Sequence, residues 1–307
     1  MTSDGGLRTG RRRKLSSEAR AAFWFLAPAL GLIGIFFVVP ILASSALSLT
    51  DFDIYGIGDL GTVRFVGLGN YRRLLGDAVF WKALGNTAYF AVAAGVLSVG
   101  AGLAAAIAVQ SRLARFKGLY RTVFFAPYVT TLVAVAVVWR YLYQPRQGLF
   151  GRVLEAVGLP AIDWLGDPLW AMPAIILLAV WKNFGYNTIL FAAGLAAIPA
   201  SLYEAAELDG ASAWQRFRHV TLPMLAPTFF FVALITTIGN LQVFAEPYVM
   251  TRGGNPLNAT LTVVMLMFKE GFRWWSIGYA SSIALVLCVV VLAATGLQAL
   301  FWRGRRA

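Results

Sequence analysis

Long apolar runs are the feature that most restricts how this chain can fold. About six stretches stay apolar over roughly 18 residues or more, the length that a helix needs to cross about 30 Å of hydrocarbon. A helix satisfies its own backbone hydrogen bonds, so it is the structure expected where water is absent. The sequence therefore predicts an all-α, polytopic membrane protein. Its expected spans are Ala21 to Leu49, Ala83 to Val109, Thr122 to Tyr143, Leu169 to Leu195, Leu225 to Met250 and Ser276 to Phe301.

The formal net charge of +12 raises the question of a nucleic-acid surface, and the distribution of the charges argues against one. The chain is 59% hydrophobic and 13% charged, whereas a soluble domain is about half apolar and a quarter charged. With the N-terminus inside, more of the 26 lysines and arginines fall in inner segments than in outer loops. The basic residues therefore indicate membrane topology. Both termini and the loop between the fourth and fifth spans are predicted to be cytoplasmic, and no nucleic-acid partner is expected.

The two ends of the chain are predicted to be basic tails. Residues 1–20 combine Gly, Ser and the run Arg11 to Lys14 with few apolar residues, so we expect a disordered cytoplasmic tail. Residues 303–307 form a second basic tail, which leaves 21–302 as the transmembrane domain. A signal peptide cleaved near Ala43 to Ala46 is the alternative, but the first apolar run is too long for a signal core.

The scarcity of reactive side chains excludes several classes of site. One Cys and one His allow no disulfide within the chain and argue against a protein-built zinc site or a Cys-His catalytic pair. No catalytic residue and no metal ligand is therefore predicted.

A polar loop, residues 199–223, interrupts the apolar spans in the second half of the chain. Ser201 to Glu204 and Ser212 to Gln215 both have the spacing of a capping box, so each Ser is expected to start a short helix. Gly210 suits a turn with positive φ after the first helix, and Pro223 limits the second because it lacks an N–H. The sequence predicts a hairpin of two short helices.

Polar side chains also lie within the fourth and fifth spans. Such groups are costly in a membrane and usually face a cavity or a partner helix, so we interpret them as the wall of a polar path. One alternative is that these side chains form hydrogen bonds between helices. Another is that Glu246, which comes shortly after Gln242, lies at the boundary with water. The candidate path residues are Lys182, Asn183, Tyr186, Thr236 and Asn240.

The polar loop carries a motif that identifies a family. It reads Glu204-Ala205-Ala206, then Gly210, then Val220 and Leu222-Pro223, and it resembles the signature of permease subunits of bacterial binding-protein-dependent ABC importers. The carbohydrate-uptake class, which includes maltose permeases, is the most similar, although Val220 stands where Ile is commoner. The resemblance to sugar permeases extends beyond this loop. Those permeases carry similar residues at the positions of Gly67 to Tyr71, Asn86 and Thr87, Ala126 and Pro127, Ile198 and Pro199, and Thr251 to Gly254.

The resemblance implies that the hairpin is a coupling element that docks on a separate ATPase. Its small and apolar side chains suit close contact with a partner. An amphipathic helix pair lying on the membrane is the alternative, but the segment lacks the Lys-rich face of such helices. The coupling residues implied are Glu204, Ala205, Ala206, Asp209, Gly210, Trp214, Phe217, Leu222 and Pro223.

The resemblance also implies partners and a location. The expected partners are a second homologous permease forming a heterodimer, a dimer of ATP-binding subunits, membrane lipid, and an extracytoplasmic solute-binding protein that contacts Thr251, Gly253 and Gly254. The expected location is the bacterial plasma (inner) membrane. The chain contains no G-x-x-x-x-G-K-[ST] loop, so ATP and Mg²⁺ are expected on the partner ATPase, and this chain is predicted to bind no cofactor and to be no enzyme.

The class of substrate follows from the same resemblance. A sugar or oligosaccharide is expected, and Lys182 leaves glycerol phosphate or a related polar solute open. A secondary transporter driven by an ion gradient is the alternative from another class, but such folds usually show internal repeats, and none is evident. A membrane-embedded enzyme lacks paired carboxylates or a His-centred cluster in the spans.

Overall fold

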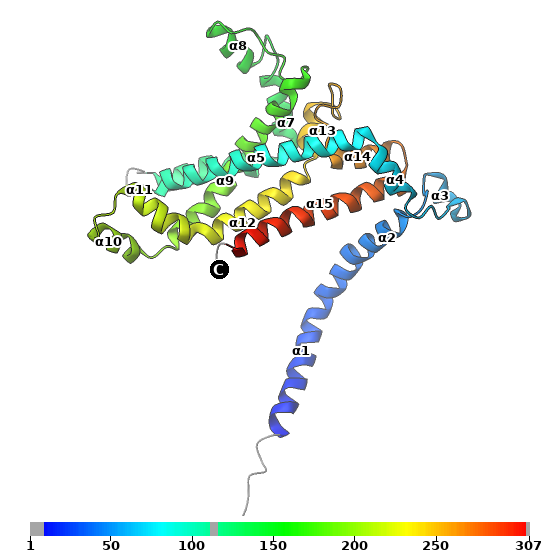
Figure 1. Cartoon of the computed structure of the whole chain (residues 1–307), viewed down its shortest axis with the longest axis horizontal. Coiled ribbons are helices and arrows are strands. Elements are labelled where there is room, and N and C mark those ends of the chain that lie inside the picture. The colour runs from blue at the N-terminus through cyan, green and yellow to red at the C-terminus, as the bar shows by residue number, and fades with distance from the viewer. Residues whose placement is uncertain (1–8, 111–115, 305–307) are drawn as a thin grey trace, which may run out of the picture.

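The computed structural model describes residues 9–110 and 116–304, which form helices and no named strand. The longest helices lie beside one another in one body, and α1 projects away from it (Figure 1). The N-terminal elements are α1 (Thr9–Ile33), the π-helical turn η1 (Gly34–Val38), α2 (Val39–Leu47), α3 (Tyr55–Gly58), η2 (Leu60–Thr62), α4 (Gly69–Gly76), α5 (Ala78–Gln110), α6 (Lys117–Val129), α7 (Leu132–Leu142) and α8 (Leu149–Ala156). The remaining elements are α9 (Pro168–Ala196), α10 (Ala200–Leu208), α11 (Ala213–Arg216), η3 (Phe217–Thr221), α12 (Leu222–Leu241), α13 (Ala245–Met250), α14 (Val263–Phe268), η4 (Lys269–Arg273) and α15 (Ile277–Gly304).

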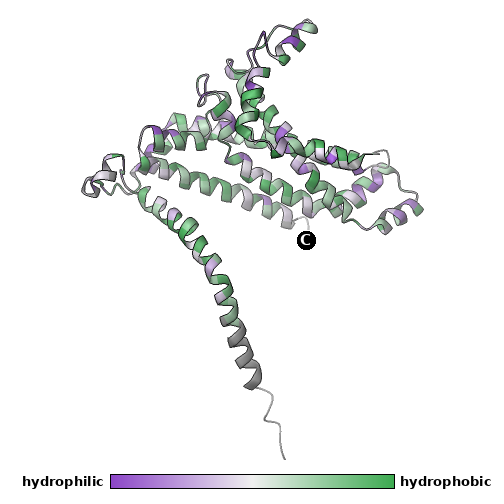
Figure 2. Ribbon diagram, turned by 180° about the vertical axis from the view of Figure 1, so that it is seen from behind, coloured by the Kyte–Doolittle hydropathy of each residue, from purple (hydrophilic) through white to green (hydrophobic). Residues whose placement is uncertain are grey.

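Five helical segments in the described part of the chain are long and apolar enough to cross a membrane. Apolar residues run along most of each, whereas hydrophilic residues gather on the small helices between them (Figure 2). The prediction of an all-α polytopic membrane protein is confirmed. The five segments are Ala21–Leu47, Ala78–Gln110, Pro168–Ala196, Ala213–Leu241 and Ile277–Trp302.

The predicted span from Thr122 to Tyr143 is not one continuous helix. It is a pair, α6 and α7, bent by 95° at a short break. Pro127 removes one hydrogen bond near the end of α6, and Thr130 then takes an extended backbone conformation. The helices have 13 and 11 residues, each shorter than the roughly 20 that cross a bilayer. The break is invisible in hydropathy because both halves are apolar.

The predicted span from Leu225 to Met250 has different limits in the structure. Its helix begins at Ala213, within the polar loop, and ends at Leu241. Pro247 prevents continuation because it has no N–H to offer the preceding turn, and instead it lies in the first turn of α13. The residues between Leu241 and α13 are therefore not helical. Glu246 does not occupy the position that it would have in a continuous helix.

The N-terminal tail also differs from the prediction. Helix α1 begins at Thr9, so the described residues 9–20 are helical where the sequence predicts disorder. From Arg11 to Ala27 the sequence has no Gly or Pro and is rich in good helix formers, so the helix of the first span extends into the basic segment. Residues 1–8 lie outside the described part of the chain, as do residues 305–307 of the predicted C-terminal tail.

Helices α5 and α9 pack along each other, and α7 and α12 pack against this pair. Gly102 of α5 allows this contact, because a Cβ added there would lie 2.6 Å from the Cβ of Asn187 on α9. One buried cluster, which includes Phe90, Trp139 and Ile175, joins these helices to α7. A second, which includes Val99, Phe191 and Leu225, joins them to α12. These contacts fix α9 and α12 as neighbours, and the cavity described below lies between them.

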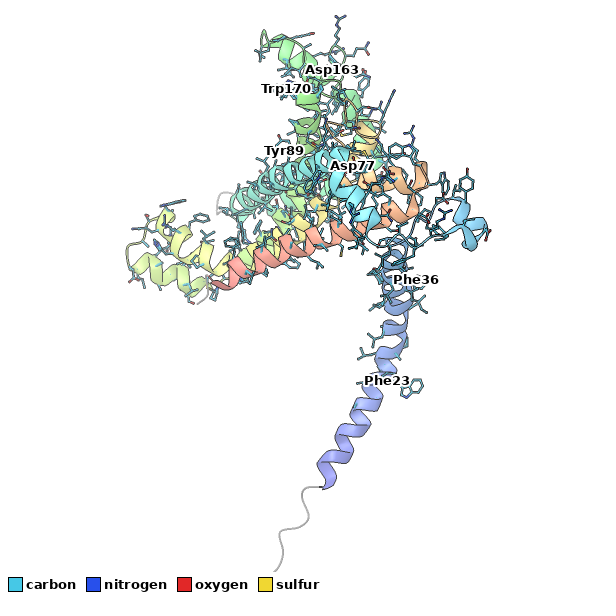
Figure 3. All side chains as sticks on the ribbon, turned by 45° about the vertical axis from the view of Figure 1, so that its right-hand side comes forward. Phe23, Phe36, Asp77, Tyr89, Asp163 and Trp170 are labelled. Carbon is cyan, nitrogen blue, oxygen red and sulfur yellow. The ribbon has the colours of Figure 1, made fainter. Side chains whose placement is uncertain are left out.

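The first span makes few contacts with the rest of the described chain. None of the residues in its most apolar stretch is buried, and the span packs on the rest mainly through α2, which contacts α15. Phe23 and Phe36, with 63% and 67% of their surface exposed, project from it into open space (Figure 3). A large apolar helical surface therefore remains without a partner among residues 9–110 and 116–304.

Candidate functional site

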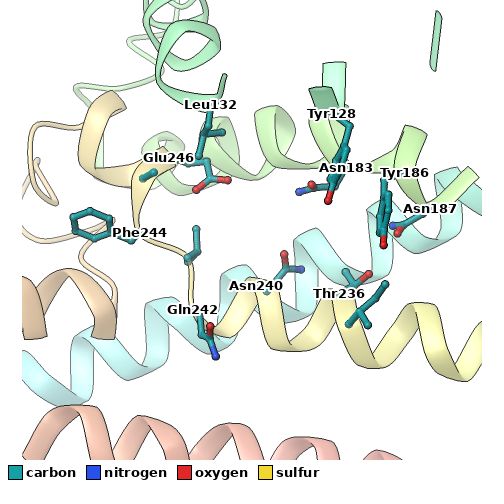
Figure 4. Close-up of a pocket in the computed structure, with 14 residues that line it drawn as sticks. Tyr128, Leu132, Asn183, Tyr186, Asn187, Thr236, Asn240, Gln242, Phe244 and Glu246 are labelled. Atoms are coloured by element: carbon teal, nitrogen blue, oxygen red, sulfur yellow. The ribbon is translucent and has the colours of Figure 1, made fainter. Parts of the chain in front are cut away.

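A cavity of about 530 Å³ lies where α9, α12 and the end of α6 come together. Four of the five predicted path residues line it: Asn183, Tyr186, Thr236 and Asn240. Figure 4 shows Thr236 and Asn240 pointing from α12 toward Asn183 and Tyr186 on α9. Residues separated by some 50 positions in the sequence thus form one polar wall.

Two tyrosines form the aromatic part of this wall. The rings of Tyr128 and Tyr186 are stacked, with centroids 4.5 Å apart and planes inclined by 12°. Tyr128 comes from the last turn of α6 and is 39% exposed. Sequence reasoning missed it, because its position on the cavity follows from the bend between α6 and α7. The pair offers a flat apolar surface bordered by polar groups.

Asn240 has two roles. Its Nδ2 atom donates a hydrogen bond of 3.4 Å to the carbonyl oxygen of Ala91 on α5, so it links two helices while lining the cavity. The interhelical hydrogen bond is therefore present, and its role in a polar path stays a prediction.

Asn187 also lines the cavity, and no sequence argument separated it from its neighbours. Its side chain is buried, and its Nδ2 atom has no hydrogen-bond partner among the described residues. A buried amide without a partner is costly, which distinguishes Asn187 from the other polar residues of the wall.

Glu246 and Gln242 complete the polar lining. Both lie in or beside the short segment that links α12 to α13, and the carboxylate of Glu246 points into the cavity (Figure 4). Glu246 is the one charged side chain among the described residues that line the cavity. The interior of the site is therefore uncharged apart from a single carboxylate.

Lys182 lies beside the cavity instead of on its wall. Its Nζ atom donates hydrogen bonds to the carbonyl oxygens of Pro127, Tyr128 and Thr130, at 3.0, 3.3 and 2.7 Å. An ammonium group has three N–H donors, so these bonds use all of them. The sequence predicts Lys182 as a path residue, and the structure instead places it at the break between α6 and α7.

The predicted coupling hairpin consists of α10 and α11, joined by a turn at Gly210. Gly210 has φ +73°, and the N–H of Ala211 bonds the carbonyl oxygen of Ala206 at 2.9 Å, closing the end of α10. The capping box between Ser212 and Gln215 is present as predicted. The box predicted at Ser201 is not, because Pro199 takes the N-cap position and Ser201 lies inside the helix.

The second helix of the hairpin is longer than predicted. It passes Pro223 and continues into α12, with the π-helical turn η3 between them. The hydrogen bonding already follows a π pattern there, with the N–H of Leu222 bonded to the carbonyl oxygen of Phe217, so Pro223 does not end the helix. The hairpin is therefore joined to a membrane span without a break.

The hairpin is bound together internally and exposes its predicted contact residues. An ion pair joins Glu207 to Arg216, and the hydroxyls of Tyr203 and Thr221 lie 2.9 Å apart. Trp214, one of the predicted coupling residues, exposes 66% of its surface, and Leu208 in the same hairpin exposes 90%. The other predicted coupling residues are partly or fully exposed: Glu204, Ala205, Ala206, Asp209, Gly210, Phe217, Leu222 and Pro223.

The three residues predicted to contact a binding protein give their loop its shape, but they are buried. The Oγ1 atom of Thr251 bonds the carbonyl oxygen of Pro247 and the hydroxyl of Thr260, at 2.6 and 2.7 Å. Gly253 and Gly254 have φ values of +88° and +104° and are also buried. The exposed side chains of this loop belong to Arg252, Asn255 and Leu257.

The sequence matches one family of known proteins over most of its length. The family described as binding-protein-dependent transport system inner membrane component matches residues 98–307. The lactose transport system permease protein of Rhizobium radiobacter is 38% identical over 89% of this chain and 91% of its own length. The sn-glycerol-3-phosphate transport system permease protein of Agrobacterium fabrum is 35% identical, over 90% and 92%.

The fold has a counterpart among solved structures. The crystal structure of a bacterial ABC transporter involved in the import of the acidic polysaccharide alginate contains a similar chain. It superposes with a TM-score of 0.80 at 21% identity and covers 95% of this chain and 98% of that one.

Proposed function

The chain belongs to the family of binding-protein-dependent transport system inner membrane components, and we propose from this membership and from the cavity that it conducts a sugar or oligosaccharide across the membrane. It is the permease subunit of an ABC importer. The observation that carries the substrate proposal is the stacked pair Tyr128 and Tyr186 beside the amides of Asn183 and Asn240.

A sugar presents hydroxyls and flat apolar C–H faces, and this wall can bind both. Amide side chains donate and accept hydrogen bonds, and an aromatic ring offers an apolar face. Relatives named for transport of lactose and of trehalose/maltose support the same class of substrate.

Glycerol phosphate is the second candidate, because one relative is named for its transport. A phosphate needs a cation or several N–H donors. Lys182, the cation that suggested this ligand, is engaged by three backbone carbonyls, and the charged group on the wall is the carboxylate of Glu246. The cavity therefore favours a neutral sugar.

The energy for transport comes, in this proposal, from a dimer of ATP-binding subunits on which the α10–α11 hairpin docks. The chain itself has no phosphate-binding loop, so ATP and Mg²⁺ bind to that partner and this chain binds no cofactor. The exposed Leu208 and Trp214 are suited to insertion in a groove, and a hairpin continuous with α12 transmits movement to the cavity.

A second homologous permease completes the transport unit as a heterodimer. The first span packs on the described bundle mainly through α2, so the apolar surface of α1 is free to contact the helices of such a partner as well as lipid. The solute-binding protein docks on the opposite, extracytoplasmic side, on the loop shaped by Thr251, Gly253 and Gly254. With the broken α6–α7 pair crossing the membrane as a sixth span, both termini lie in the cytoplasm with the hairpin.

Reconstituted uptake tests this function. Proteoliposomes with the full complex and its binding protein should accumulate radiolabelled neutral disaccharide when ATP is supplied, and should not do so when the ATPase subunits are omitted. Uptake that persists without the ATPase and follows an imposed proton or sodium gradient would instead identify a secondary transporter.

A further inference from the structure

The break between α6 and α7 leaves backbone groups that the helices themselves do not satisfy. The last carbonyls of any helix lack an N–H four residues ahead, and here the chain turns by 95° at that point. Within a membrane such groups find no water, so they need another donor. The Nζ atom of Lys182 donates to the carbonyls of Pro127, Tyr128 and Thr130, and the carbonyl of Pro127 also accepts from the Oγ1 atom of Thr130.

Burial and charge both favour Lys182 at this position. Only 8% of its surface is exposed, and its positive charge lies at the C-terminal end of α6, where the helix dipole favours a cation. No acidic side chain of the described residues lies within 4 Å of its Nζ atom, and the carboxylate of Glu246 acts on its charge only from a longer distance, so the backbone carbonyls are its hydrogen-bond partners. Its contacts are those of a cap for the broken helix.

The same turn of α9 makes two further contacts with the end of α6. Gly185 lets the backbones approach closely, because a Cβ added there would overlap the carbonyl oxygen of Phe124. Tyr186, one turn after Lys182, stacks on the ring of Tyr128. Tyr128 is thus fixed twice, by its carbonyl oxygen on Lys182 and by its ring on Tyr186.

Helix α9 also leads directly to the predicted coupling hairpin. It ends at Ala196, about 21 Å from Lys182 along the helix, and α10 begins at Ala200. A displacement of the hairpin therefore moves α9, and whatever is attached to α9 moves with it.

We propose that Lys182 is a positioning residue that ties the α6–α7 break to α9, so that movement of the coupling hairpin also moves Tyr128 in the cavity wall. The proposal rests on the proposed transport function. It assigns Lys182 to the conversion of ATPase movement into a change of cavity shape, and not to binding of an anionic substrate.

The coupling ratio, sugar transported per ATP hydrolysed, tests this role in the reconstituted full complex with radiolabelled maltose. Lys182→Met should lower the ratio by about tenfold, because charge-assisted bonds to the carbonyls are lost. Lys182→Arg, which keeps a cationic donor, should restore most of it. Thr295→Val is the control and should leave the ratio unchanged, since it removes a side-chain donor to two backbone carbonyls within α15, a helix that neither lines the cavity nor belongs to the hairpin. A merely structural role would lower transport and ATP hydrolysis together and leave the ratio unchanged.

A distance measurement tests the geometry independently of any substrate. Spin labels at the exposed Leu119 on α6 and Val138 on α7, with Cys288 replaced by Ser, report the bend. With the ideal helical rise and a bend of 95°, the backbones at residues 119 and 138 lie about 19 Å apart. In a straight helix they would lie about 28 Å apart. The Lys182→Met variant should shift or broaden the distribution toward the longer value, and Lys182→Arg should not.

The outcomes separate this inference from the function on which it rests. If the wild-type complex shows no ATP-driven uptake, the proposed function fails, whatever the labels report. If wild-type uptake is normal but Lys182→Met retains both the coupling ratio and the label distance, Lys182 is not the tie. Should Lys182→Met fail to assemble, Lys182→Gln, which keeps a neutral donor, replaces it and should show an intermediate loss; an unchanged ratio there overturns the proposal.

Discussion

The ring of Tyr128 lies on the ring of Tyr186, with the two planes inclined by 12°. One belongs to α6 and the other to α9, so the pair exists because α6 ends at this point. It gives the cavity an aromatic surface next to the amides of Asn183 and Asn240.

Replacing Tyr186 with Ala should raise the KM for sugar uptake by about tenfold, because the stacked surface is removed. Tyr186→Phe keeps the ring and should change KM by no more than about threefold. Initial rates of radiolabelled maltose uptake in proteoliposomes measure both. Equal effects of the two variants would mean that the hydroxyl, and not the ring, is what the substrate uses.

Replacing Asn240 with Leu should weaken sugar transport and leave docking of the ATPase subunits intact. The change removes an amide from the cavity and one hydrogen bond to Ala91, whose carbonyl still has its own helix partner. Uptake and co-purification of the ATPase are measured on the same preparation. An unchanged uptake rate would assign Asn240 to helix packing alone.

Replacing Gly210 with Val should uncouple ATP hydrolysis from transport without preventing membrane insertion. Gly210 has φ +73°, a conformation that costs an L-residue about 1–2 kcal/mol and a β-branched one more. No neighbouring atom would clash with an added Cβ, so the effect isolates the backbone. Gly210→Asn is the matched control, because Asn tolerates this conformation and should retain uptake. Normal uptake by the Val variant would count against a fixed hairpin angle.

Replacing Glu246 with Gln should relax discrimination against anions. A carboxylate in a poorly solvated cavity repels a phosphate about 8 Å away by about 2 kcal/mol at an effective dielectric constant of about 20, so its removal should strengthen glycerol 3-phosphate binding by about tenfold or more. Tryptophan fluorescence of the purified complex, titrated with glycerol 3-phosphate and separately with maltose, provides the comparison. Equal anion affinity in the wild type and the variant would show that Glu246 does not set this preference.

Those parts of the fold that depend on local chemistry follow from the sequence. The apolar runs predict the spans, Gly210 predicts the turn, and Ser212 predicts its capping box. The Ser201 box fails because Pro199 competes for the same N-cap. The prediction of a disordered tail is wrong from Thr9 onward, because the helix propensity of these residues extends the first helix beyond its apolar part.

Those parts of the site that depend on tertiary contacts do not follow from the sequence. Hydropathy reads α6 and α7 as one span, so it cannot place Tyr128 on the cavity or turn Lys182 toward the break. Thr251 and the two glycines after it match the family pattern because they shape a loop, and their burial shows only in three dimensions. The coupling role of the hairpin and the contact role of this loop stay predictions.

The central claim is that the cavity between α9 and α12 is the path of the transported sugar, and thiol labelling at Thr236 tests it most directly. Thr236→Cys, in a chain whose one native cysteine, Cys288, is replaced by Ser, places a reactive group on the cavity wall. In the reconstituted complex, maltose delivered by the binding protein should slow labelling by a small maleimide, and ATP should change the side of the membrane from which the reagent reaches it. A labelling rate that responds to neither sugar nor ATP would contradict the account.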